Sequence, residues 1–229
     1  MQMIEKKILL LQKIPTLINQ FNAKPTKYKS SLETSFETFL KHHPYDTEIW
    51  IKFALLLHCL IKDNQKAVEC LNNVLHYNSN NVYVTMLLIF ISENISPMND
   101  KLFEMLCTLN SPNKEILSLI EYQKAWYYLP KDEELYRYTL EHSIELCDKF
   151  VWNHKALGAF YFFRNEIDIG RILFRKALTN IHHVYTSHEF QSVGACDINE
   201  FFNARLKGTH ILQPMVFMMI NAIEQHCIP

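Results

Sequence analysis

Residues 155–178 read KALGAFYFFRNEIDIGRILFRKAL and contain two of the four glycines in the chain, Gly158 and Gly170. Helix-favouring residues surround both, although a glycine inside a helix costs about 1 kcal/mol relative to alanine. The glycines either belong to a phosphate-binding or catalytic loop, or they mark a place where two helices touch. A phosphate loop needs a preceding strand and a following lysine motif. The sequence predicts neither, so we interpret the pair as a helix contact.

Helix-forming segments recur along the whole chain. Apolar periodicity and turn residues predict helices at 3–20, 30–42, 47–61, 64–77, 82–93, 98–109, 113–128, 132–149, 152–164, 167–180, 197–206 and 214–226. Pro15 predicts a kink or break in the first helix. The stretch VYVTMLLIFI has a strand-like composition, but it has no hairpin partner and occupies a helix position. The sequence therefore predicts an all-α fold of paired helices.

The spacing within one pair resembles the tetratricopeptide family, whose signature is W-x2-L-G-x2-Y, then F-x2-A and Pro, over about 34 residues. His154 and His182 stand where the family prefers Trp and Pro. The small residue of the second helix is Gly170. The other matching residues are Leu157, Gly158, Tyr161, Phe174 and Ala177.

A second copy precedes it, with one extra residue in the turn near Lys62. Its matching residues are Trp50, Phe53, Ala54 and Leu57 in the first helix and Ala67, Leu71 and Val74 in the second. Residues 82–150 keep the rhythm of helix pairs but match the signature poorly. The alternatives are an irregular helical bundle with chance matches and a related array such as half-a-tetratricopeptide repeats.

The resemblance covers roughly residues 30–182. It implies a tetratricopeptide-like, right-handed α-solenoid of antiparallel helix pairs, about four in number. We expect residues 1–29 to form an N-terminal helix and residues 183–229 to form a C-terminal helical cap, because terminal repeats need a cover.

Arrays of this family are usually interaction modules whose first helices line a concave groove for a peptide or helix. Carried over to this chain, the groove positions are Glu48, Ile51, Leu55, His58, Trp152, Lys155, Ala159 and Phe162. Such a groove is apolar and aromatic. Ala159 stands where binders of a chaperone's terminal carboxylate need Asn, so we do not expect that ligand. Packing against a neighbouring repeat is the alternative role for Leu55 and Phe162.

Signatures of catalysis and metal binding are weak. GxSxG, P-loop, GxGxxG and HExxH motifs are absent from the sequence. His182 and His183 are adjacent and would not face the same way on a helix, so we interpret them, with His188, as helix-end polarity. The same interpretation holds for His42 and His43.

Cys196 lies in a turn before a predicted helix, where a thiol can be activated. No catalytic partner is identifiable, and Asp197 is explained more simply as the N-cap of that helix. We therefore expect a non-catalytic adaptor or scaffold without cofactor or metal. The rival hypothesis is an enzyme, or an accessory domain of one, that uses the C-terminal segment.

The C-terminal segment is rich in apolar residues, namely Phe201, Phe202, Met215, Phe217, Met218 and Met219. A capping helix pair is the simpler explanation, and an adaptable Met-rich docking surface is the alternative. Arg205, Lys207 and His210 form a compact basic cluster. A solvated turn is the default interpretation, and a site that receives an acidic group is the alternative.

Composition limits the classes of partner. Apolar residues make up 48% of the chain, charged residues 21%, and the net charge is −1. The six cysteines form no CxxC pair, which suits a reducing compartment. The apolar runs fall short of the roughly 20 residues that span a bilayer, and the N-terminal stretch lacks a signal-peptide cleavage pattern. We expect a soluble cytoplasmic protein that binds a protein or peptide, with neither nucleic acid nor a membrane as partner.

Overall fold

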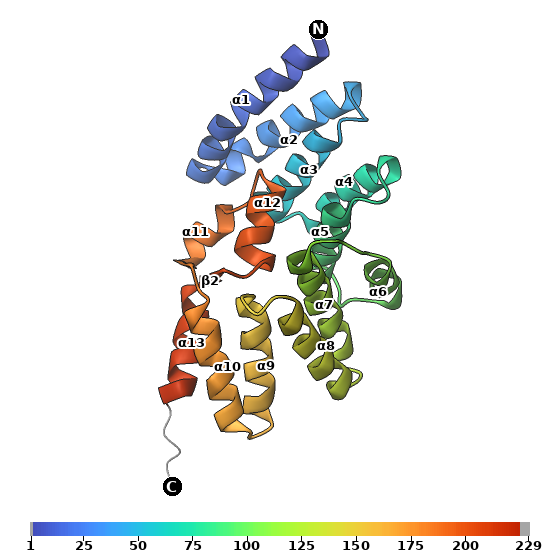
Figure 1. The fold of residues 1–229 in the computed structure, drawn as a ribbon. Coiled ribbons are helices and arrows are strands. Elements are labelled where there is room, and N and C mark those ends of the chain that lie inside the picture. The colour runs from blue at the N-terminus through green and yellow to red at the C-terminus, as the bar shows by residue number, and fades with distance from the viewer. Residues whose placement is uncertain (1, 225–229) are drawn as a thin grey trace.

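The computed structural model describes residues 2–224, apart from the side chains of Gln2, Met3 and His188 (Figure 1). These residues are mostly helical, which confirms the predicted all-α class. The first helices are α1 (Gln2–Ala23), α2 (Pro25–His42), α3 (Thr47–Leu56), the π-helical turn η1 (Leu57–Ile61), α4 (Asn64–Tyr77), α5 (Val82–Glu93) and α6 (Asp100–Cys107). They are followed by α7 (Lys114–Tyr128), α8 (Glu133–Leu146), α9 (Val151–Phe163) and α10 (Ile167–Thr179).

Aspartate and asparagine set the starts of most of these helices. Each such residue accepts a hydrogen bond from a backbone N–H in the first turn, which satisfies a donor that the helix itself leaves free. The capping residues are Asp46, Asp63, Asn81, Asn99, Asn113 and Asp132. The predicted boundaries therefore agree closely with the observed ones from α3 to α10.

Two predictions near the N-terminus need correction. Helix α1 is continuous through Pro15, so the break predicted there is wrong and the kink stays a prediction. Helix α2 begins at Pro25 and not at residue 30, because a proline in the first turn has no N–H that needs a partner. The stretch VYVTMLLIFI is helical, as predicted, and lies within α5.

Consecutive helices pack against one another along the chain. The most extensive contacts join α9 with α10, α7 with α8, α1 with α2, and α3 with α4. Smaller contacts link one pair to the next, as between α2 and α3, α4 and α5, and α8 and α9. The helices thus form a row of hairpins (Figure 1).

The two helical glycines face each other in the α9–α10 hairpin. A Cβ atom built on Gly170 would lie 2.9 Å from the Gly158 carbonyl oxygen and 2.9 Å from Phe162 Cδ2. A Cβ on Gly158 would lie 2.8 Å from the Phe174 ring and 3.2 Å from the Gly170 carbonyl oxygen. Neither position has room for a side chain, so the glycines bring the two helices into close contact, as their spacing predicts.

The chain after α10 folds back along the row. It forms β1 (His183–Tyr185), α11 (Ser187–Ser192), α12 (Ile198–Phe201), the π-helical turn η2 (Phe202–Leu206), β2 (His210–Leu212) and α13 (Gln213–Glu224). The two strands pair in parallel, with His183 opposite His210. Helix α13 packs against α10, whereas α11 contacts η1 and α12 contacts α3. We call residues 187–208 the returning segment.

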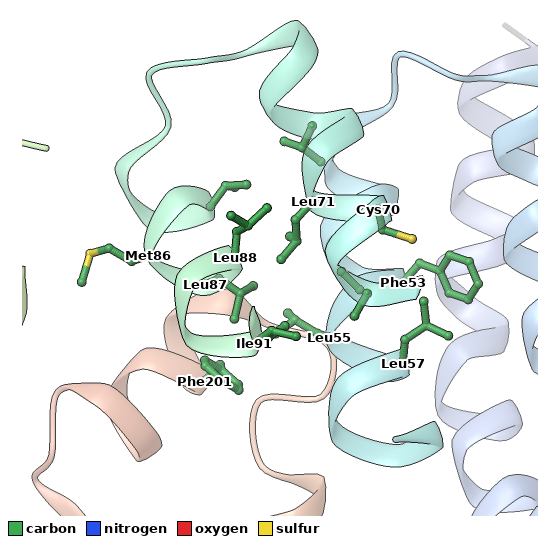
Figure 2. Close-up of a cluster of buried hydrophobic side chains, with 14 of the residues drawn as sticks. Phe53, Leu55, Leu57, Cys70, Leu71, Met86, Leu87, Leu88, Ile91 and Phe201 are labelled. Atoms are coloured by element: carbon green, nitrogen blue, oxygen red, sulfur yellow. The ribbon is translucent and has the colours of Figure 1, made fainter. Parts of the chain in front are cut away.

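The returning segment adds to the main hydrophobic core. This core runs through α3, α4 and α5, where Leu55, Leu71 and Leu87 are fully buried, and Phe201 of α12 belongs to it (Figure 2). In the part of the chain that the structure describes, no helix is both long enough and apolar enough to cross a membrane.

Candidate functional site

The predicted groove residues of α3 and η1 are engaged within the chain. Glu48 is exposed and forms an ion pair with Lys7 of α1, with Oε2 2.8 Å from Nζ. Ile51 is half-buried, and Leu55 is fully buried in the core. Packing is therefore the observed role of Leu55, which was the alternative drawn from the sequence.

His58 lies under the returning segment. Its ring centroid is 5.8 Å from that of Phe201 and 5.9 Å from that of Phe90. Its Nδ1 atom lies 2.8 Å from Asn64 Oδ1. Burial lowers the pKa of His58 to about 4, so the ring is neutral at physiological pH.

The predicted groove residues of α9 divide between two places. Trp152 packs against Gly208, where an added Cβ would lie 2.1 Å from Trp152 Cδ1. Lys155 is half-buried with Nζ 5.5 Å from the Trp152 ring centroid, and burial lowers its pKa. Ala159 and Phe162 instead line a cavity of about 610 Å³ against α13. The structure therefore does not gather the eight positions into one open groove.

The returning segment covers this face through apolar and polar contacts. The Phe202 ring lies edge-on to Tyr83, with centroids 5.3 Å apart. Lys52 Nζ donates to the Cys196 carbonyl oxygen at 2.9 Å, and Lys207 pairs with Glu115 at 3.0 Å. A short helix of the chain is thus docked on the helices that the sequence assigns to ligand binding.

Beside the docked helix the structure leaves an open cavity of about 530 Å³, which we call the aromatic cavity. It lies between α5, α7 and α9 on one side and the returning segment on the other. Its aromatic wall residues are Phe90, Tyr122, Trp126, Tyr127, Trp152 and Phe190. Trp126 is 38% exposed, so its ring is accessible to a ligand. A cavity of this size with mostly apolar walls is typical of ligand sites.

The charged residues of the aromatic cavity differ in their partners. Arg205 donates to the carbonyl oxygens of Val193 and Phe190, and its guanidinium lies 4.5 Å from the Phe190 ring centroid. Lys131 pairs with Asp100 at 3.1 Å. Glu93 differs from both, because within residues 2–224 its carboxyl group has neither an ion pair nor a hydrogen bond. Burial raises the pKa of Glu93 to about 7.

Two other residues of the cavity wall carry unsatisfied polar atoms. Gln123 is 2% exposed, and its Oε1 atom has no hydrogen-bond partner among the described residues, while Nε2 donates to the Met86 carbonyl at 3.5 Å. Trp152 Nε1 is likewise buried and without an acceptor in the described chain. A buried polar group left unpaired costs about 1–3 kcal/mol, so such groups point to a partner outside the chain.

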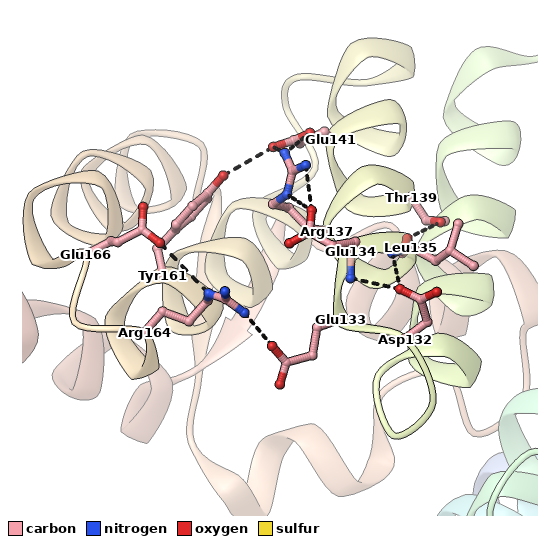
Figure 3. Close-up of polar contacts among 10 residues, drawn as sticks. All are labelled: Asp132, Glu133, Glu134, Leu135, Arg137, Thr139, Glu141, Tyr161, Arg164 and Glu166. Carbon is pink, nitrogen blue, oxygen red and sulfur yellow. Dashed lines mark hydrogen bonds and ion pairs between the residues drawn. The ribbon is translucent and has the colours of Figure 1, made fainter.

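The arginines beside α8 and α9 contrast with Glu93, since each is paired with glutamate (Figure 3). Arg137 pairs with Glu134 and Glu141, both at 2.9 Å, and Arg164 pairs with Glu133. Exposed pairs of this kind contribute little binding energy.

The cysteine and histidine candidates lie in different places. His182 and His210 line a cavity of about 380 Å³ together with Glu115, Cys147 and Lys207, whereas Cys196 does not line it. Burial raises the pKa of the Cys196 thiol to about 11, so the thiol is protonated at neutral pH and lacks the activation of a nucleophile. Asp197 Oδ1 accepts from the Glu200 N–H at 2.9 Å, which confirms the predicted N-cap. Among the described side chains, no group of three or more histidine, cysteine or acidic residues is placed to hold a metal ion. The side chain of His188, and Cys227, lie outside the described residues.

Of the residues at the aromatic cavity, sequence reasoning identified Trp152 as a groove residue and Arg205 as part of a basic cluster, and missed the others. Glu93, Tyr122, Gln123 and Trp126 belong to residues 82–150, where the repeat signature is too weak to assign a phase. The available signal was the row of aromatic residues in EYQKAWYYLP, residues 121–130. Models of known protein families and curated protein sequences yield no match to this chain.

Proposed function

We propose that the chain is a non-catalytic protein- or peptide-binding module, an adaptor or scaffold built as a tetratricopeptide-like α-solenoid. The repeat spacing and the Gly158–Gly170 contact support the family assignment. The row of hairpins is the arrangement expected for such an array.

One observation carries the binding function. The chain's own helix at Phe201 is docked on α3, η1 and α5, with the aromatic cavity open beside it. Docking of a helix on a hydrophobic face is a common mode of peptide recognition. A partner peptide therefore has an accessible place at the cavity, where its side chain would contact Trp126 and Trp152.

Selection from a displayed random peptide library tests this proposal. We expect the full chain to select peptides whose affinity falls at least about tenfold on Trp126→Ala, because an aromatic hot-spot residue typically contributes about 2 kcal/mol or more. Tyr138→Ala is the matched control, since Tyr138 is 64% exposed on α8 and does not line the cavity. Failure to select any peptide, or selected peptides that bind Trp126→Ala as tightly as the parent, would refute the proposal.

A further inference from the structure

We propose that the aromatic cavity binds the cationic side chain of an arginine or lysine from the partner, with Glu93 as the counter-charge. This inference rests on the proposed peptide-binding function and names the chemistry of its ligand. Three features of the cavity carry it: an uncompensated carboxyl group, accessible aromatic faces, and a buried acceptor without a donor.

Glu93 is the uncompensated carboxyl group. It is half-buried and is the last residue of α5, where the negative end of the helix dipole disfavours an anion and favours a cation. The two cations of the cavity do not offset it. Neither Lys131 nor Arg205 acts on the pKa of Glu93, which burial alone raises. A cation bound next to Glu93 would supply the missing partner.

The aromatic faces suit the same ligand. Cations are attracted to the faces of Trp, Tyr and Phe within about 6 Å of the ring centroid. The chain already uses this contact at the edge of the cavity, where Lys131 Nζ lies 3.5 Å from the Tyr127 ring centroid. Tyr122 and Trp126 line the cavity without a cation of their own among the cation–ring contacts of the described residues.

Gln123 supplies the third feature. Its Oε1 atom accepts no hydrogen bond within the described chain, and an ammonium or guanidinium group carries several N–H donors and no acceptor. A neutral apolar ligand would fill the cavity but leave both Glu93 and Gln123 without partners. An anionic ligand would add repulsion from Glu93. Glu93 and Gln123 therefore favour a cationic side chain over the other two classes. Trp152 Nε1 needs an acceptor instead, which a backbone carbonyl of the same peptide carries.

Butylguanidinium and its neutral isostere butylurea test the inference on the full chain by NMR. The chain has three tryptophans, so the indole N–H signals report directly on the cavity. We expect butylguanidinium to shift the Trp126 and Trp152 signals saturably in the millimolar range. Trp50 is the internal reference, because it does not line the cavity and its Nε1 donates to the Pro44 carbonyl at 2.8 Å. Butylurea should bind at least about tenfold more weakly.

The variant Glu93→Gln should weaken butylguanidinium binding at least about tenfold and leave butylurea binding unchanged. Glu104→Gln is the matched control, since Glu104 is an exposed glutamate on α6. Binding of butylguanidinium should also weaken roughly tenfold from pH 8 to pH 6, because a carboxyl with a pKa of about 7 becomes protonated over that range. The pKa values of Tyr122 and Lys131 are raised, so neither group titrates over this range. Burial lowers the pKa of Arg205, but a guanidinium group stays protonated at these pH values.

Equal binding of the two probes, unchanged binding by Glu93→Gln, or no shift at all would each overturn the inference. The selected peptides separate this failure from that of the proposed function. If the selected peptides require Trp126 for binding but show no enrichment of arginine or lysine and bind Glu93→Gln as tightly as the parent, the cationic ligand is refuted. The peptide-binding function would then be left standing. If no peptide is selected, the proposed function fails, and the partner cation inferred from it fails with it.

Discussion

The contact between Gly158 and Gly170 can be tested by the sign of the stability change on Gly170→Ala. Replacing Gly170 by alanine in a helix that made no close contact would stabilise the chain by about 1 kcal/mol. In this structure the new Cβ would lie 2.9 Å from the Gly158 carbonyl oxygen, about 0.5 Å short of the 3.4 Å at which ordinary contact begins. A backbone atom cannot rotate away, so α9 and α10 must separate.

Overpacking of a tight contact costs about 1–3 kcal/mol. We expect the upper part of this range, because Phe162 Cδ2 blocks the same position from a second side at 2.9 Å. After the helix-propensity gain is subtracted, Gly170→Ala should destabilise the chain by about 2 kcal/mol. For a chain of this size the melting temperature should fall by about 4–8 °C.

Urea unfolding followed by circular dichroism measures this change. Gly158→Ala should cost less than Gly170→Ala, because its closest contact is the Phe174 side chain at 2.8 Å and the carbonyl oxygen is at 3.2 Å. Gly158→Leu should cost ~1–3 kcal/mol. Arg175→Ala on the same helix is the control and should change stability by less than about 0.5 kcal/mol, because Arg175 is exposed. A Gly170→Ala protein that is more stable than the parent would refute the close contact.

Three further predictions concern other parts of the structure. The free energy of unfolding should fall as pH drops from 6.5 to 4, because His58 binds a proton in this range in the unfolded chain but not in the folded chain, where its pKa is about 4. The variant His58→Phe should reduce the slope of the unfolding free energy against pH. Asn153→Ala should cost about 1–3 kcal/mol in urea unfolding, because Asn153 Nδ2 donates to Ser143 Oγ at 2.7 Å in a buried network between helices. Gly208→Ala should expose the returning segment to limited proteolysis, because φ at Gly208 is +71° and the new Cβ would overlap Trp152.

The helices could be predicted because their signals are local. Asp46, Asp63 and Asn81 each cap a helix within three residues of themselves, and the periodicity of the following segment completes the pattern. The Gly158–Gly170 contact was predictable for a similar reason, since the two residues belong to one hairpin and are separated by a short turn. Helix content, and the helix boundaries from α3 to α10, thus follow from the sequence almost directly.

The path of the returning segment could not be predicted in this way. Its contacts join residues far apart in the chain, such as Lys52 and Cys196, and no local pattern encodes them. The strands β1 and β2 have three residues each, too few to produce a periodic signal. The sequence therefore identified an apolar C-terminal segment but not the face on which it docks.

The unpredicted path of the returning segment matters most for the candidate site. Sequence phasing placed the ligand along α3 and α9, where the structure puts the returning segment against His58 and Trp152. The residues that remain accessible come from α5 and α7, which match the repeat signature poorly. The residues of the repeat signature serve helix packing. A site specific for one ligand is therefore expected at residues outside the signature, such as Glu93 and Trp126.

The aromatic cavity has walls from two sources, and this links ligand binding to docking of the returning segment. Trp126 and Trp152 come from the row of hairpins, whereas Phe190 and Arg205 come from the returning segment. A ligand that contacts both walls binds only the state in which the returning segment is docked. Binding of such a ligand therefore stabilises the docked state. Because the docked segment is part of the same chain, its effective concentration is high. A partner that replaces Phe201 must compete with the docked segment. A partner that binds at the cavity beside the docked segment does not compete with it.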